Sequence, residues 1–78
     1  MDSQAMGLLV AGIGAAVVTI GAAFAIAKIS ASSSENIGRQ PEAAGPIRGT
    51  AIITAALIEG LALFALGIFF MIQFKVKL

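Results

Sequence analysis

Two uninterrupted apolar stretches constrain this chain more than any other feature of its sequence. They run roughly from Met6 to Ile29 and from Ile52 to Phe74, and each contains a single charged residue, Lys28 in the first and Glu59 in the second. At about 1.5 Å per residue, each stretch is long enough to cross a hydrocarbon core about 30 Å thick. A soluble domain of 78 residues could not bury a sequence that is 59% hydrophobic, because small domains have too much surface for their volume. The sequence therefore predicts an all-α integral membrane protein.

The segment between the two stretches is polar and contains Pro41 and Pro46. Because proline disrupts a helix interior, we expect the tight turn between Arg39 and Gly45. The fold class predicted is a two-helix transmembrane hairpin with both termini on one side. The predicted boundaries within the single unit 1–78 are helix one at about 6–31, a polar loop at about 32–47 and helix two at about 48–75.

A cleavable signal peptide is the alternative interpretation of the first stretch, since Ala23-Phe24-Ala25 looks like a cleavage site. The residues before the apolar run include Asp2 and no lysine or arginine. The run also exceeds the usual apolar length of a signal peptide, about 7–15 residues. We therefore expect the first stretch to remain as a membrane helix.

The composition excludes several classes of function. The chain has no cysteine and no histidine, so it lacks the usual ligands of zinc, haem and iron–sulfur clusters. Its net charge is +1, and no basic patch is present that could bind nucleic acid. We expect no cofactor, no metal and no nucleic-acid partner.

Small residues are concentrated in the first stretch, where eleven of 24 residues are glycine or alanine. In lipid, helices associate through close backbone approach, which small side chains permit. A two-helix monomer offers only one neighbour, so this density predicts an oligomer with the first helices packed in an inner layer. The second stretch is bulkier and suits contact with lipid. The predicted packing residues are Gly12, Gly14, Gly21, Ala23 and Ala25.

Glu59 is the candidate functional residue. It lies eleven residues after Arg48 and sixteen before Lys75, about 16 Å and 24 Å along a helix. A carboxylate at this depth costs about 2.5 to 3.5 kcal/mol on insertion scales. The membrane therefore favours the neutral acid, which takes up and releases a proton as its surroundings change. The alternative is a permanently protonated acid that bonds a neighbouring helix.

Lys28 is the other deep charge, and in an antiparallel hairpin it falls opposite residues 53–57. It could pair with Glu59, or its stem could extend toward the polar loop. We favour the second arrangement, because a permanent ion pair would hold the carboxylate charged. The remaining charges are expected to be solvated in the loop (Glu35, Arg39, Glu42 and Arg48) or to anchor the helix at the interface (Lys75 and Lys77).

The loop motif Arg39-Gln40-Pro41, continuing as Glu42-Ala43-Ala44-Gly45, resembles the polar-loop signature of the c-ring proteolipid of rotary F-type ATP synthases. In that family an essential carboxylate stands twenty residues after the loop arginine, which here is Glu59. The context from 55 to 63 is also similar, and the resemblance covers nearly the whole chain. The family's alternating glycines are only partly present, since the stretch reads Gly21, Ala23 and Ala25. Wider helix spacing and a different number of subunits per ring could follow.

The resemblance implies a homo-oligomeric ring of identical subunits and membrane lipid around it. Each Glu59 would load and release its proton at the a subunit of Fo and cross the lipid as the neutral acid. Rotation would couple proton flow to ATP synthesis or hydrolysis in the soluble head, and the chain would not be catalytic by itself. The loop residues Arg39, Gln40 and Pro41 would touch the central-stalk subunits gamma and epsilon.

Because a start at Met1 fits a bacterial chain better than an imported mitochondrial one, we expect a bacterial inner (plasma) membrane. The resemblance also implies that the loop lies on the cytoplasmic side. The positive-inside rule does not decide this, because the loop and the termini carry similar positive charge.

Sodium is the other ion that this family carries, and its sodium-type members supply a glutamine on helix one and a hydroxyl just after the carboxylate. The matching positions are Ile26, thirteen residues before Arg39, and Gly60. Neither offers a side-chain oxygen, so we expect a proton. The predicted residues that line the site are Ile26, Ile58, Gly60 and Leu61.

Two other functions compete with the rotor. A pore-forming or structural hairpin, such as a holin-like protein, would explain two helices and a polar turn but not a carboxylate at mid-membrane. A small proteolipid that modulates a larger pump as a single subunit would not need small residues around the whole first helix.

Overall fold

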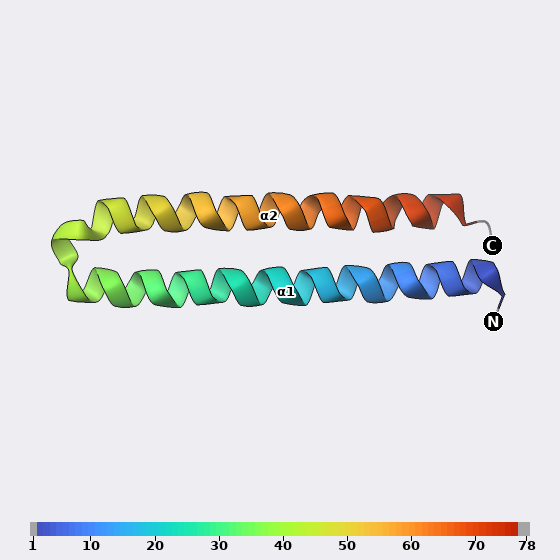
Figure 1. Ribbon diagram of the computed structural model, residues 1–78, viewed down its shortest axis with the longest axis horizontal. Coiled ribbons are helices and arrows are strands. Elements are labelled where there is room, and N and C mark those ends of the chain that lie inside the picture. Colours follow the sequence, from blue (N-terminus) through green and yellow to red (C-terminus); the bar gives the residue numbers. More distant parts are fainter. Residues whose placement is uncertain (1, 77–78) are drawn as a thin grey trace.

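The computed structural model describes residues 2–76, which form a hairpin of two long antiparallel helices (Figure 1). Helix α1 spans Ser3–Arg39 and helix α2 spans Ala44–Lys75. Gln40 and a short 3₁₀ helix, η1 (Pro41–Ala43), join them. The hairpin measures 58 × 17 × 10 Å, and its two ends lie together opposite the turn. The predicted helical hairpin is confirmed, and both helices are long and apolar enough to cross a membrane.

Local hydrogen bonds define the ends of α1. The Asp2 carboxylate accepts a hydrogen bond from the backbone N–H of Ala5 at 2.7 Å, which satisfies one of the free donors at the start of the helix. At the other end, the N–H of Gln40 donates to the carbonyl of Asn36 at 2.9 Å. The turn therefore follows directly on α1, within the range predicted from the two prolines.

The predicted loop at about 32–47 is wrong, because most of it is helical. Helix α1 continues to Arg39, and α2 already begins at Ala44. Polar residues are compatible with a helix that projects into water, and two contacts one turn apart support it here. Arg39 pairs with Glu35 at 2.7 Å, and the side-chain amide of Asn36 donates to the Ser32 carbonyl at 2.8 Å.

Pro46 does not interrupt α2, because it is the third residue of that helix. The first four N–H groups of a helix have no acceptor within it, so the missing donor of proline costs nothing there. Each helix is thus longer than a bilayer is thick: α1 has 37 residues, which is about 55 Å against a hydrocarbon core of about 30 Å.

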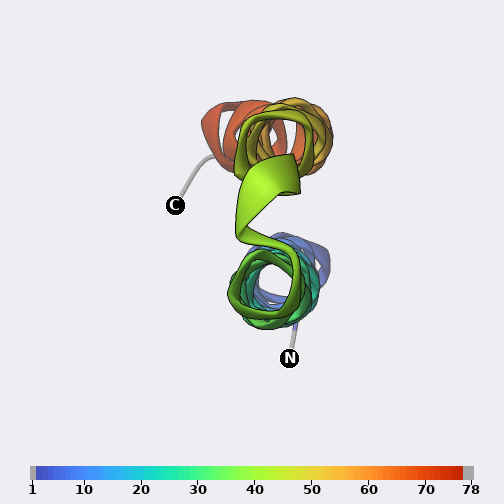
Figure 2. The ribbon, with the colours of Figure 1, turned by 90° about the vertical axis from the view of Figure 1, so that its left-hand side faces the viewer.

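One seam of side chains at every third or fourth position holds the two helices together. On α1 it includes Ala11, the one buried residue among those described, and on α2 it includes Phe69. Gly14 lies against Phe69 so closely that a β-carbon at Gly14 would overlap the phenyl ring. Seen from the turn, the described residues form a single pair of helices, and apart from the short η1 at the turn no further element packs against them (Figure 2). Large apolar side chains consequently stay exposed, such as Phe64 at 80%.

The predicted packing residues fall into two groups. Gly14 and Ala25 are half-buried in the seam with α2. Gly12, Gly21 and Ala23 are exposed on the hairpin, and a β-carbon at either glycine would meet nothing within 4 Å. Packing within one hairpin therefore uses two of the five positions, and the other three lie on surfaces that another helix can approach.

Candidate functional site

Glu59 lies halfway along α2. It is the sixteenth residue of a helix of 32, which places it about 23 Å from either end. The close approach of Gly14 to Phe69 fixes the register of the pair. Following both helices from this contact toward the turn by ten residues leads to Phe24 on α1 and Glu59 on α2, which therefore lie at the same level. The side chain of Glu59 is exposed on the hairpin, whereas its neighbour Ile58 is half-buried against α1.

Glu59 projects from one flank of the hairpin. Residues seven apart lie almost in line on a helix, so Ile52, Glu59 and Leu66 form one row. Ile52 lines a groove between the helices near the turn, and Leu66 lines another near the chain ends. We call this side the Glu59 flank. The other side is the opposite flank, where Gly21, Ala25 and Leu61 line a groove of about 450 Å³ at mid-depth.

The predicted lining residues do not surround Glu59 within one hairpin. Ile58 and Leu61 line the mid-depth groove on the opposite flank, and Ile26 lines the groove near the turn. Gly60 is exposed with open space around its α-carbon. Successive residues of a helix point about 100° apart, so the sequence neighbours of Glu59 face in different directions. Within one hairpin, the predicted lining residues therefore do not form a single site around Glu59.

Lys28 does not extend toward the turn, and that expectation is wrong. Its amino group lies 5.5 Å from the centre of the Phe24 ring, one helical turn back toward the amino terminus. Helical side chains lean in this direction, and the aromatic face attracts the cation. Lys28 follows Gly21 by seven residues and therefore shares the opposite flank with it. In a single hairpin, Lys28 and Glu59 lie on different sides.

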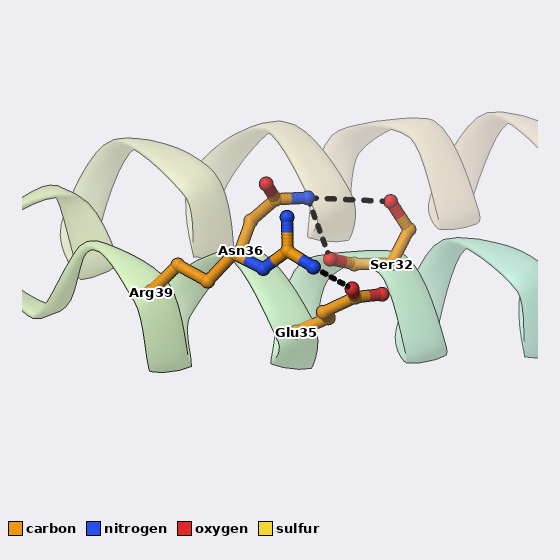
Figure 3. Close-up of polar contacts among 4 residues, drawn as sticks. All are labelled: Ser32, Glu35, Asn36 and Arg39. Atoms are coloured by element: carbon orange, nitrogen blue, oxygen red, sulfur yellow. Dashed lines mark hydrogen bonds and ion pairs between the residues drawn. The ribbon is translucent and has the colours of Figure 1, made fainter.

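Charged and polar residues of the predicted loop cluster at the tip of the hairpin. The pair of Arg39 and Glu35 is largely exposed, and beside it the Asn36 amide reaches the carbonyl and hydroxyl of Ser32 (Figure 3). Among residues 2–76 this is the one ion pair, so Glu59 is paired with neither Lys28 nor Arg48. Lys75 is the last residue of α2, and Lys77 lies outside the described residues.

The sequence-based prediction missed a polar groove of about 300 Å³ near the turn on the Glu59 flank. We call it the turn-side groove. Three serines of α1 and one arginine of α2 form its polar part, and isoleucines and alanines form the rest. Its polar residues are Ser30, Ser33, Ser34 and Arg48. The spacing of the serines by three and four residues indicates one helical face, but a run assigned to a loop conceals that signal.

Comparison with known proteins gives a consistent result. The family whose model matches the chain is that of the ATP synthase C subunit, and the match covers residues 9–72. The chain is 56% identical to the ATP synthase c subunit of Phocaeicola vulgatus over 78% of its length and 73% of that protein. It is 52% identical to the ATP synthase c subunit of Bacteroides thetaiotaomicron over 82% of its length and 75% of the relative. The chloroplastic ATP synthase c subunit of Galdieria sulphuraria is 38% identical, over 85% of this chain and 82% of its own. No solved structure matches.

Proposed function

The chain belongs to the ATP synthase C-subunit family, and on that premise we propose that Glu59 is the carboxyl group that carries the proton. The protein is a proton-translocating rotor subunit of the F-type ATP synthase, a two-helix bacterial membrane protein that assembles into a ring. The observation that carries the proposal is the position of Glu59 at the midpoint of α2, exposed on one flank and without an ion-pair partner in the described part of the chain.

The free-energy cost of a charged carboxyl group in the membrane allows rotation into the lipid only when Glu59 is protonated. Moving the charged form into lipid costs about 2.5 to 3.5 kcal/mol, a factor of about 60 to 400 in population. The protonated form carries no such penalty, so a rotor hairpin leaves the a subunit for the lipid with its proton bound. The carboxylate is stable only beside water or a cation, which the a subunit would provide. The chain itself catalyses no bond-forming step in this scheme.

The opposite flank of the next hairpin would complete the site. In a ring, the Glu59 flank of one hairpin meets the opposite flank of its neighbour. The mid-depth groove of that neighbour lies level with Glu59, and small residues such as Gly21 and Ala25 leave it open. Glu59 as the neutral acid would be sheltered there from lipid, beside the neighbour's Leu61. This arrangement would gather the lining residues that one hairpin keeps apart.

The transported ion is proposed to be a proton rather than sodium. A sodium ion needs several oxygen ligands, whereas Ile26, Ile58 and Gly60 offer no side-chain oxygen around the carboxyl group. A lone carboxyl group in apolar surroundings suffices for a proton. No cofactor is needed for this function.

The tip of the hairpin is proposed as the contact with the stalk. Arg39, Gln40 and Pro41 stand where α1 ends and η1 begins, at the far end from both termini (Figure 1). Gamma and epsilon subunits on the cytoplasmic side would bind this tip. The loop would then lie in the cytoplasm and the chain ends on the other side of the membrane.

Modification by a hydrophobic carbodiimide tests the role of Glu59, since the reagent attacks protonated carboxyl groups in apolar surroundings. We expect Glu59 to be the modified residue and proton transport to stop with it. Glu59→Gln should leave the ring assembled and abolish transport. Glu42→Gln is the matched control, because Glu42 is an exposed carboxylate at the tip, and it should leave both properties unchanged. Proton transport by a ring of Glu59→Gln hairpins would refute the proposal, because transport without the carboxyl group is the result expected of a pore-forming hairpin.

A further inference from the structure

We propose that Arg48 of each hairpin binds the Glu35 carboxylate of the next hairpin, in the turn-side groove, and that this pair locks the ring together. The proposal rests on the ring assembly of the family and not on the proton-carrying role of Glu59. The groove opens on the Glu59 flank, and its polar lining consists of the serines of α1 and Arg48 of α2. A cation flanked by hydroxyl groups is suited to a carboxylate, because the guanidinium donates several hydrogen bonds in a fixed fork and the hydroxyls donate others.

Arg48 has no carboxylate partner within residues 2–76 of its own hairpin. Among the residues that the structure describes, the single ion pair joins Arg39 to Glu35. The side chain of Arg48 instead borders the turn-side groove beside Ser33 and Ser34. An arginine at the membrane boundary is more stable with an anion than alone, because part of its hydration is lost there. The positive charge of Arg48 in the groove is therefore not neutralised within the described part of the hairpin.

Glu35 lies at the same level as Arg48 but on the other side of the hairpin. The register set by Gly14 and Phe69, continued for 21 residues toward the turn, places Glu35 beside Arg48 in depth. Two intervals of seven residues separate Glu35 from Gly21, which lines the mid-depth groove of the opposite flank. In a ring, Glu35 therefore faces the neighbouring hairpin. That neighbour presents its Glu59 flank, and with it the turn-side groove, to Glu35.

The Glu35 carboxylate has capacity for a second cation. Its side chain is 62% exposed, and Arg39 contacts one oxygen, Oε1, at 2.7 Å. A carboxylate accepts about four hydrogen bonds, so Oε2 can bind an arginine from the neighbour while Arg39 keeps its contact. Each hairpin then offers a cation on one flank and an anion on the other. Such a head-to-tail interface repeats around a closed ring with one lock at each contact.

A double-mutant cycle on the assembled ring tests the lock. Arg48→Gln and Glu35→Gln should each lower the temperature at which the detergent-resistant ring separates into monomers. The double variant should lower it no further than the larger single effect, because the same pair is lost. Glu42→Gln combined with Arg48→Gln is the matched control, and its effects should add. Additive effects in the 35/48 cycle would overturn the proposal.

Cross-linking keeps the test decisive if a charge variant fails to assemble. The chain contains no cysteine, so a Glu35→Cys chain and an Arg48→Cys chain can be co-expressed, each with wild-type hairpins. A bismaleimide of about 10 Å reach, longer than a disulfide allows, should join the two chains into a dimer band. Asn36→Cys paired with Thr50→Cys is the control, because both residues line one groove on the opposite flank. No 35–48 dimer, or an Arg48→Gln effect that depends on anionic lipid instead of residue 35, would refute the lock.

Discussion

Replacing Gly14 with alanine should weaken the hairpin, because the new methyl group would occupy the place of the Phe69 ring. The overlap is with Cε1 and Cζ, the far edge of the ring. The ring would therefore turn aside, or the helices would separate. Overpacking in a close-fitting contact costs about 1–3 kcal/mol. Because the outer part of a mobile side chain absorbs the clash, we expect the low end of this range, about 1–1.5 kcal/mol, or about 5- to 12-fold in the equilibrium between packed and separated helices.

The measurement is the free energy of unfolding of the hairpin in bilayers by single-molecule force spectroscopy. Gly67→Ala is the matched control, since it is the same substitution in a membrane helix at a position where a β-carbon meets nothing within 4 Å. Phe69→Leu should reduce the penalty of Gly14→Ala, because the smaller side chain vacates the space. Equal unfolding free energies for Gly14→Ala and Gly67→Ala would refute the packing argument.

Three further predictions follow from local contacts. Asp2→Ala removes the cap of α1 and should cost about 1 kcal/mol in the first turn, seen as roughly fivefold faster amide exchange there; unchanged exchange would contradict it. Arg39→Gln removes an exposed pair worth about 0.3–0.5 kcal/mol, so ring stability should hold while coupled ATP synthesis falls; loss of the ring would contradict a role in stalk contact. Ile26→Gln combined with Gly60→Ser should create sodium ligands, so that sodium slows carbodiimide modification of Glu59 in the double variant and not in the wild type; protection of the wild type would contradict proton specificity.

The hairpin could be predicted from the sequence because a membrane leaves few choices. Two apolar runs of spanning length must be helices, since backbone groups in lipid have to bond within the segment. Pro41 also located the turn, whereas Pro46 lies in the first turn of α2. The helix ends could not be predicted, because the serines after Ile29 are neutral toward helix formation and the Arg39–Glu35 pair that supports the last turn needs the helix to exist first.

The sequence could not predict which way each small residue of α1 faces, for a different reason. Glycine and alanine occur all round α1, so composition alone does not separate Gly14, which meets Phe69, from Gly12, which meets nothing. The register of α2 decides between them. The proposed lining residues have the same difficulty, since Ile58 and Leu61 flank Glu59 in sequence yet line a groove on the opposite flank.

The division of residues between two flanks explains why this chain needs copies of itself. A single seam buries only Ala11 fully among the described residues and leaves the rows on both flanks exposed. The Glu59 flank offers the carboxyl group and the turn-side groove, and the opposite flank offers the mid-depth groove and, in the proposed lock, Glu35. Glu59 lies level with the mid-depth groove, and the turn-side groove lies level with Glu35. Both matches follow from the register of the two antiparallel helices within one hairpin. A change in helix register within the hairpin would therefore misalign the proton site and the proposed ion pair together, whereas a change at Ala23, which lies outside the seam, would alter the spacing between hairpins and leave the levels matched.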